Sequence, residues 1–137
     1  MKGMMRDREN TRSNILIVDP ERDTGELFAR SLETHRDCKC YLASDETEVM
    51  SLLKDIRFEL VLADLSLLMA VDFALLKRIR KTFPNVRVIA DGYLHQRAQL
   101  TLALAHGAEG TIIKPIKVDL FRRQIDAFCM ARTSRVS

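Results

Sequence analysis

The amino-acid sequence predicts an α/β domain built on a parallel β-sheet with helices covering both faces. Five short apolar runs alternate along the chain with five stretches of helical periodicity. Parallel strands need long crossover connections, usually helices, so this alternation is typical of successive right-handed βαβ units. Four of the runs are apolar at almost every position, as expected for strands that are buried on both sides.

The five predicted strands are short and bounded by polar or glycine-containing segments. They cover residues 14–19 (NILIVD), 38–43 (CKCYLA), 58–64 (FELVLAD), 86–90 (VRVIA) and 110–114 (GTIIK). The second strand alternates polar and apolar residues, which predicts a position at the edge of the sheet. The other four strands are predicted to be central.

Each strand is followed by residues at helical spacing. Asp45 and Glu48 stand in capping-box spacing at the start of the second helix, whereas Pro84 and Gly107 mark the ends of the third and fourth helices. The periodic residues are Leu27, Phe28, Ser31, Leu32 and His35 in the first helix; Val49, Leu52, Leu53 and Ile56 in the second; Leu75, Leu76, Ile79 and Phe83 in the third; Ala98, Leu102 and Ala105 in the fourth; and Phe121, Ile125 and Phe128 in the fifth.

The chain of 137 residues has the length of one domain. We expect this domain to cover residues 13–130, with flexible tails at 1–12 and 131–137, and to stand alone, with any output module on another protein. The N-terminal segment lacks the apolar core of a secretory signal, and no apolar run approaches the ~20 residues of a membrane span. We therefore expect a cytoplasmic protein with no membrane partner.

The net charge of +3 does not predict a nucleic-acid-binding protein. The first 13 residues and the last seven carry +2 each, which leaves −1 for the body of the domain. Because the folded body has no evident basic face, we expect no direct contact with nucleic acid.

The three cysteines are too few for a disulfide framework in a cytosolic chain. Cys38 and Cys40 share one face of the second strand, and paired metal ligation is the alternative. No second Cys or His pair completes a tetrahedral site, so we favour reduced, structural cysteines.

Asp64 ends the third strand and interrupts the run ELVLADLSLL. From this stretch alone, Asp64 is either a turn or N-cap residue, or a site residue at an exposed strand end. In an open parallel sheet, ligands bind outside the carboxyl ends of the strands. Asp19 closes the first strand, Asp91 and Gly92 follow the fourth, and Lys114 closes the fifth. Two carboxylates and one ammonium are therefore predicted to converge, which favours the site reading of Asp64.

Carboxylates that lie close together repel one another unless a cation separates them, and hard oxygen ligands suit Mg²⁺. A carboxylate beside Mg²⁺ and a lysine can attack a phosphoryl group to form an aspartyl phosphate. The residues therefore favour a phosphoacceptor site. A glycosidase pair is disfavoured because no aromatic-lined saccharide cleft is evident, and no glycine-rich phosphate loop is present.

The chain resembles a response-regulator receiver domain of two-component signalling over about residues 13–130. The resemblance rests on ILIVDPE, ELVLAD and GAEGTIIKPI. It implies a three-layer, doubly wound (βα)5 flavodoxin-like fold with strand order 2-1-3-4-5. It also implies a phosphoacceptor role for Asp64, a phosphate-contacting role for Lys114, and an Mg²⁺ site formed by Asp19, Asp64 and the backbone carbonyl of Ser66.

The resemblance departs from the family pattern at several site positions. Pro20 stands where a second acidic residue is usual, which predicts weakened Mg²⁺ binding, and Glu21 is the next available carboxylate. The switch hydroxyl of the fourth strand is replaced by Gly92, or by Asp91 if one residue is deleted. Three further departures are Thr111 in place of the switch aromatic of the fifth strand, Leu68 where proline is common, and Asp72 where glycine is common. Asp72 is predicted to be the N-cap of the third helix.

Two functions remain open at this point. The first is a receiver that a histidine kinase or phosphotransfer protein phosphorylates on Asp64 and that signals by protein contact, not an enzyme. The second is a phosphorylation-independent pseudo-receiver that serves as an interaction module. A metal-dependent phosphatase is a weak third reading. The resemblance implies that the fourth helix, fifth strand and fifth helix contact a downstream protein or a second copy of the chain.

Overall fold

The computed structural model describes residues 12–136, with side chains described through Met130, and has three layers. In this described part of the chain, five parallel strands form one sheet of order β2-β1-β3-β4-β5. These strands are β1 (Ser13–Val18), β2 (Cys38–Ala43), β3 (Leu60–Asp64), β4 (Arg87–Tyr93) and β5 (Gly110–Lys114). The fold class is the one that the sequence predicts, and the strand order is the one that its family resemblance implies.

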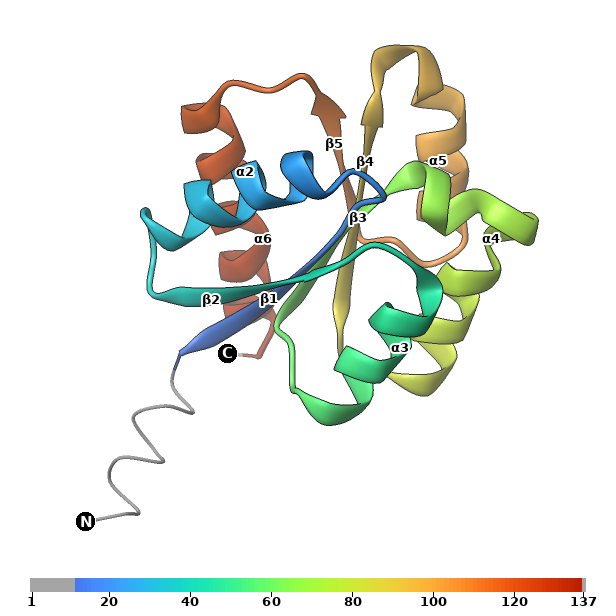
Figure 1. The fold of residues 1–137 in the computed structure, drawn as a ribbon, viewed down its shortest axis with the longest axis horizontal. Coiled ribbons are helices and arrows are strands. Elements are labelled where there is room, and N and C mark those ends of the chain that lie inside the picture. Colours follow the sequence, from blue (N-terminus) through green and yellow to red (C-terminus); the bar gives the residue numbers. More distant parts are fainter. Residues whose placement is uncertain (1–11, 137) are drawn as a thin grey trace.

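Within residues 12–136, five α-helices and one 3₁₀ helix connect and follow the strands. They are α2 (Arg22–Glu33), α3 (Glu46–Asp55), α4 (Leu65–Thr82), η1 (Leu94–Gln96), α5 (Arg97–Ala105) and α6 (Val118–Val136). Helices α2 and α6 cover one face of the sheet, and α3, α4 and α5 cover the other (Figure 1). Within the described residues, no helix is long and apolar enough to span a bilayer.

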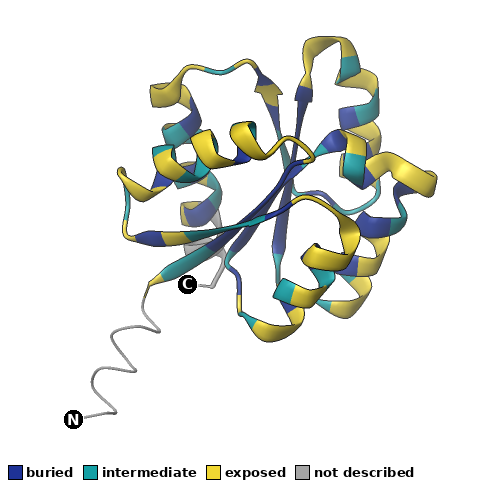
Figure 2. Cartoon of the chain, viewed as in Figure 1, coloured by how far each residue is buried: buried dark blue, intermediate teal, exposed yellow. Residues whose placement is uncertain are grey.

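Alternate residues of the central strands enter two separate cores. Leu16 and Val61 pack with α3, α4 and α5, whereas Ile17 and Leu62 pack with α2 and α6. This is why β1 and β3 are apolar at successive positions, and in Figure 2 they form part of the buried centre. The pattern fixes the strand register, because a shift by one residue would exchange the two cores.

The sheet has two edge strands, of which the sequence predicted one correctly. β2 pairs only with β1, as its alternation indicated. From its composition β5 was predicted to be central, whereas the strand order implied by the resemblance places it at the edge. It pairs only with β4, and its Ile113 side chain is exposed. Its apolar composition was therefore misleading about its place in the sheet.

The core-facing side of α5 also differs from the prediction. Leu100 and Ala103 are buried, whereas Leu102 is 51% exposed and Ala98 and Ala105 are exposed as well. This short helix is apolar on most of its surface, so hydrophobic spacing alone did not select the buried side.

Helix α4 begins directly after Asp64 and is interrupted by a left-handed stretch. Val71, Asp72 and Phe73 have φ angles of 54°, 55° and 60°. Asp72 therefore lacks the extended backbone of an N-cap residue, and its carboxylate lies 3.2 Å from Lys77 Nζ. The predicted N-cap role of Asp72 is wrong.

The predicted domain boundaries remain a prediction. Residues 1–11 of the proposed N-terminal tail lie outside the described residues. Helix α6 extends to Val136, so its last residues fall in the segment predicted as the C-terminal tail.

Candidate functional site

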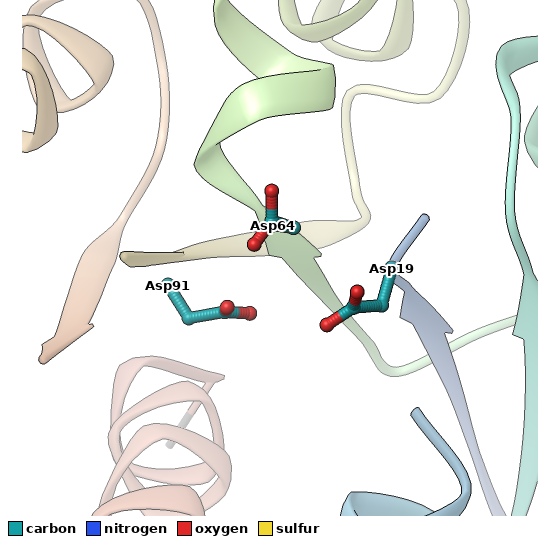
Figure 3. A group of neighbouring side chains, drawn as sticks. All are labelled: Asp19, Asp64 and Asp91. Atoms are coloured by element: carbon teal, nitrogen blue, oxygen red, sulfur yellow. The ribbon is translucent and has the colours of Figure 1, made fainter. Parts of the chain in front are cut away.

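Four charged side chains meet at the carboxyl ends of the strands. Asp19 follows β1, Asp64 ends β3, Asp91 lies in β4, and Lys114 ends β5. One carboxylate oxygen from each of the three aspartates lies within 4.8 Å of the other two (Figure 3). The structure thus brings together the groups that the sequence placed at these strand ends.

Lys114 joins two of the aspartates. Its Nζ lies 2.8 Å from Asp64 Oδ1 and 2.9 Å from Asp91 Oδ1, and its side chain is 8% exposed. Burial lowers the pKa of Lys114, but the hydrogen bond to Asp64 and the charge of Asp91 outweigh it and leave the pKa above its ordinary value. Lys114 is therefore a fixed positive charge at neutral pH.

Asp64 serves as both the N-cap of α4 and a member of the site. Its Oδ2 accepts hydrogen bonds from the Ser66 backbone N–H, at 3.0 Å, and from the Ser66 hydroxyl. Its Oδ1 accepts the bond from Lys114. The two readings left open by the sequence are therefore compatible, because each oxygen of the carboxylate has its own partners.

Asp19 has one satisfied oxygen and one orphaned oxygen. Oδ1 accepts a hydrogen bond from the Glu21 backbone N–H at 2.8 Å, whereas Oδ2 is buried with no hydrogen-bond partner among the described residues. Burial raises the pKa of Asp19, the Glu21 N–H opposes this effect, and the Asp64 charge adds to it.

Asp91 is the most buried of the four charged residues, at 1% exposure. It is paired with Asp64 across β3 and β4, so both side chains lie on the same side of the sheet. Burial raises the pKa of Asp91 to about 7, although the Lys114 charge acts in the opposite direction. Asp91 was predicted to follow the fourth strand, but β4 continues to Tyr93 and includes it.

A side chain at Gly92, the alternative to Asp91 at the switch position, would point away from the carboxylates. A Cβ there would lie 3.1 Å from Gln96 Oε1, 3.4 Å from Leu100 Cδ2 and 3.4 Å from Leu65 Cβ. Asp91, and not Gly92, therefore directs its side chain toward Asp64.

The remaining predicted residues lie around the site. Glu21 is exposed at the N-cap of α2, and its carboxylate is not part of the acidic group. Thr111 is half-buried and paired with Ala90. The metal-binding role proposed for the Ser66 carbonyl stays a prediction.

Tyr93 is a site neighbour that sequence reasoning missed. It pairs with Lys114 across β4 and β5, and the Lys114 ammonium lies 4.9 Å from the centre of its ring. The ring is 47% exposed and stacks on His95 at 5.9 Å. Only the cross-strand register reveals this cation–π contact, because the two residues are far apart in sequence.

The donor set fits a hard divalent cation. With its carboxylates ionised, the acidic group carries −3 against the single charge of Lys114, which leaves −2. Carboxylate oxygens are the ligands that Mg²⁺ prefers, and the orphaned Asp19 Oδ2 requires a positive partner or a hydrogen-bond donor. Mg²⁺ would supply charge neutralisation at this end of the sheet.

Comparisons with known proteins agree with this geometry. A family model described as the response regulator receiver domain matches residues 15–126. A search of curated proteins finds no match. NtrX from Brucella abortus is similar in structure, with a TM-score of 0.83 and 25% identity over 91% of this chain, which spans 28% of that protein.

Two smaller solved structures support the same fold. A response regulator from Thermotoga maritima has a TM-score of 0.79 and 22% identity, covering 87% of this chain and 98% of its own. A CheY-like receiver domain protein from Methanospirillum hungatei has a TM-score of 0.77 and 21% identity, covering 91% of this chain and 99% of its own.

Proposed function

Because the chain belongs to the response regulator receiver domain family, we propose that it accepts a phosphoryl group on Asp64 and signals through protein contact. Members of this family are signalling modules, and they bind Mg²⁺ at an acidic pocket. The phosphoryl group would come from a histidine kinase or a phosphotransfer protein.

The position of Asp64 is the observation that carries this proposal. Its side chain is 14% exposed, against 2% for Asp91, and Lys114 Nζ lies 2.8 Å from its Oδ1. Asp64 thus combines access for a donor with an adjacent fixed positive charge. Lys114 can stabilise the negative charge that develops on the transferred phosphoryl oxygens.

The reaction is a transfer between two side chains. A carboxylate oxygen of Asp64 attacks the phosphorus of a phosphohistidine, the new O–P bond forms, and the P–N bond breaks. The histidine nitrogen leaves with the bonding electron pair and takes up a proton from solvent. Asp19, Asp64 and the Ser66 carbonyl would hold Mg²⁺, which neutralises phosphoryl charge when bound.

The exposed apolar side chains favour a protein partner on the face formed by α5, β5 and α6. Leu102 is 51% exposed, Leu104 44%, Ile113 36% and Leu120 43%. These residues belong to the fourth helix, fifth strand and fifth helix of the receiver pattern. Either a downstream protein or a second copy of the chain would bury them.

A second candidate function is a phosphorylation-independent interaction module. It is favoured by Asp91, whose carboxylate lies 2.9 Å from Lys114 Nζ, where it competes for the ammonium that a phosphoryl group needs. An added carboxylate would also repel a phosphoryl dianion.

Phosphorylation of the full chain distinguishes the two candidates. The protein is incubated with Mg²⁺ and either acetyl phosphate or a phosphorylated histidine kinase, and intact mass is measured. We expect the mass to rise by one phosphoryl group in the wild type and in Asp55→Asn, an exposed control, but not in Asp64→Asn. The absence of any adduct with both donors would contradict the phosphoacceptor function and favour the interaction module.

A further inference from the structure

Asp91 directs a third carboxylate toward the carboxylates of Asp19 and Asp64. Figure 3 shows the Asp19 and Asp91 side chains pointing toward one another from the two sides of Asp64. The orientation of Asp91 follows from the backbone, because its register partner is Asp64 and neighbouring residues of paired strands project to the same face. Its placement does not depend on a flexible loop.

The positive charges on the described residues do not neutralise this third carboxylate. Lys114 is the only cation within ion-pair distance of Asp64 or Asp91 among the described residues, and it already contacts both. Asp19 Oδ2 is buried without a hydrogen-bond partner on the described part of the chain, and Asp91 Oδ1 has only the ion pair with Lys114. When ionised, buried carboxylates of this kind require a compensating positive charge.

A divalent cation would supply the positive charge that the acidic group lacks. The residual charge of −2 equals the charge that such an ion would neutralise, and the three available ligand atoms are all carboxylate oxygens. Hard cations prefer oxygen ligands, and each additional ligand charge increases their affinity. A hydroxyl at position 91 would reduce the negative charge of the acidic group by one.

We propose that Asp91 is a ligand of the divalent cation in the unphosphorylated protein, together with Asp19 and Asp64. This inference deepens the proposed function because it concerns the same site, but it requires no phosphoryl transfer. It also assigns a role to a position that departs from the family pattern. The carboxylate that Pro20 fails to supply next to β1 comes instead from β4.

Mg²⁺ titration of the full chain by isothermal calorimetry tests the inference. We expect Asp91→Asn and Asp91→Ser each to weaken Mg²⁺ binding at least tenfold at pH 8, whereas Asp55→Asn binds as the wild type does. Asn keeps the size of the side chain, and Ser restores the hydroxyl of the family pattern. Wild-type affinity, or tighter binding, in both Asp91 variants would overturn the inference.

A measurement on the wild type removes any dependence on how the variants fold. The side-chain carboxyl ¹³C resonance of each aspartate is assigned by correlation with the backbone resonances of the same residue. Each resonance is then followed during the Mg²⁺ titration. We expect the resonances of Asp19, Asp64 and Asp91 to shift with one common dissociation constant. A titration that moves Asp19 and Asp64 but not Asp91 would refute the role of Asp91.

The outcome can be separated from that of the phosphorylation experiment. If Asp64 takes no phosphoryl group while Asp91→Asn loses Mg²⁺ affinity, the phosphoacceptor function fails and the metal inference stands. If Asp64 is phosphorylated while Asp91→Asn keeps its Mg²⁺ affinity, only the metal inference fails.

Discussion

Replacing Asp91 by Asn should stabilise the metal-free protein at alkaline pH. Asp91 is 1% exposed, and burial raises its pKa from 3.8 to about 7. A rise of about three units, at 1.36 kcal/mol per unit, corresponds to about 4 kcal/mol of destabilisation when the carboxyl group is ionised. Asn resembles the protonated carboxyl group and avoids this cost.

The effect should depend on pH in a defined direction. Between about pH 4 and pH 7 the unfolded state releases the Asp91 proton while the folded state keeps it, so the free energy of unfolding falls as pH rises. The variant should therefore match the wild type near pH 4 and exceed it by up to about 4 kcal/mol at pH 8. The groups that face Asp91, namely Lys114, Asp64 and Asp19, are the same in both proteins.

Urea unfolding in EDTA at pH 4, 6 and 8 measures this difference, with Asp55→Asn as the exposed control. Removing one partner of a buried ion pair usually destabilises a protein by leaving the other charge alone. Here Lys114 keeps Asp64 at 2.8 Å, so we expect burial to outweigh the lost pair. A variant that is less stable than the wild type at pH 8 would refute this reasoning.

Three further predictions concern other positions. Val71→Gly should raise the free energy of unfolding by about 1 kcal/mol in urea unfolding, because the φ of 54° strains the backbone of a β-branched residue and the side chain is 85% exposed. Unchanged or lower stability would show that the backbone at Val71 is not strained. Pro20→Asp should tighten Mg²⁺ binding by calorimetry about tenfold by adding a carboxylate next to Asp19, and an unchanged affinity would show that position 20 does not reach the ion. Gly110→Ala should lower stability by about 2 kcal/mol because its Cβ would overlap the Phe128 ring, and a wild-type melting temperature would show that the ring moves aside.

The sequence predicted the layers of the fold because both signals for them are local. Apolar runs in β1 and β3 reflect burial on two faces, and the segments between strands have helical spacing. The place of β5 was mistaken, since an edge strand covered by α6 can be as apolar as a central one. Position in a sheet depends on pairing with other strands, which local composition does not report.

The site was predicted only as far as strand ends could be located. Asp19, Asp64 and Lys114 could be identified because each closes an apolar run. Asp91 was ambiguous, because the choice between it and Gly92 depends on where β4 ends and on its register with β3. The contact between Tyr93 and Lys114 needs the register of β4 with β5, so no property of either residue in sequence revealed it.

The cation–π contact gives the site an optical readout. The chain has two tyrosines and no tryptophan, so Tyr41→Phe leaves Tyr93 as the sole tyrosine in the protein. Because the Tyr93 ring lies 4.9 Å from the Lys114 ammonium, its ultraviolet emission should respond when that nitrogen moves or changes its partners. Events at Asp64 could then be followed in real time without an attached dye.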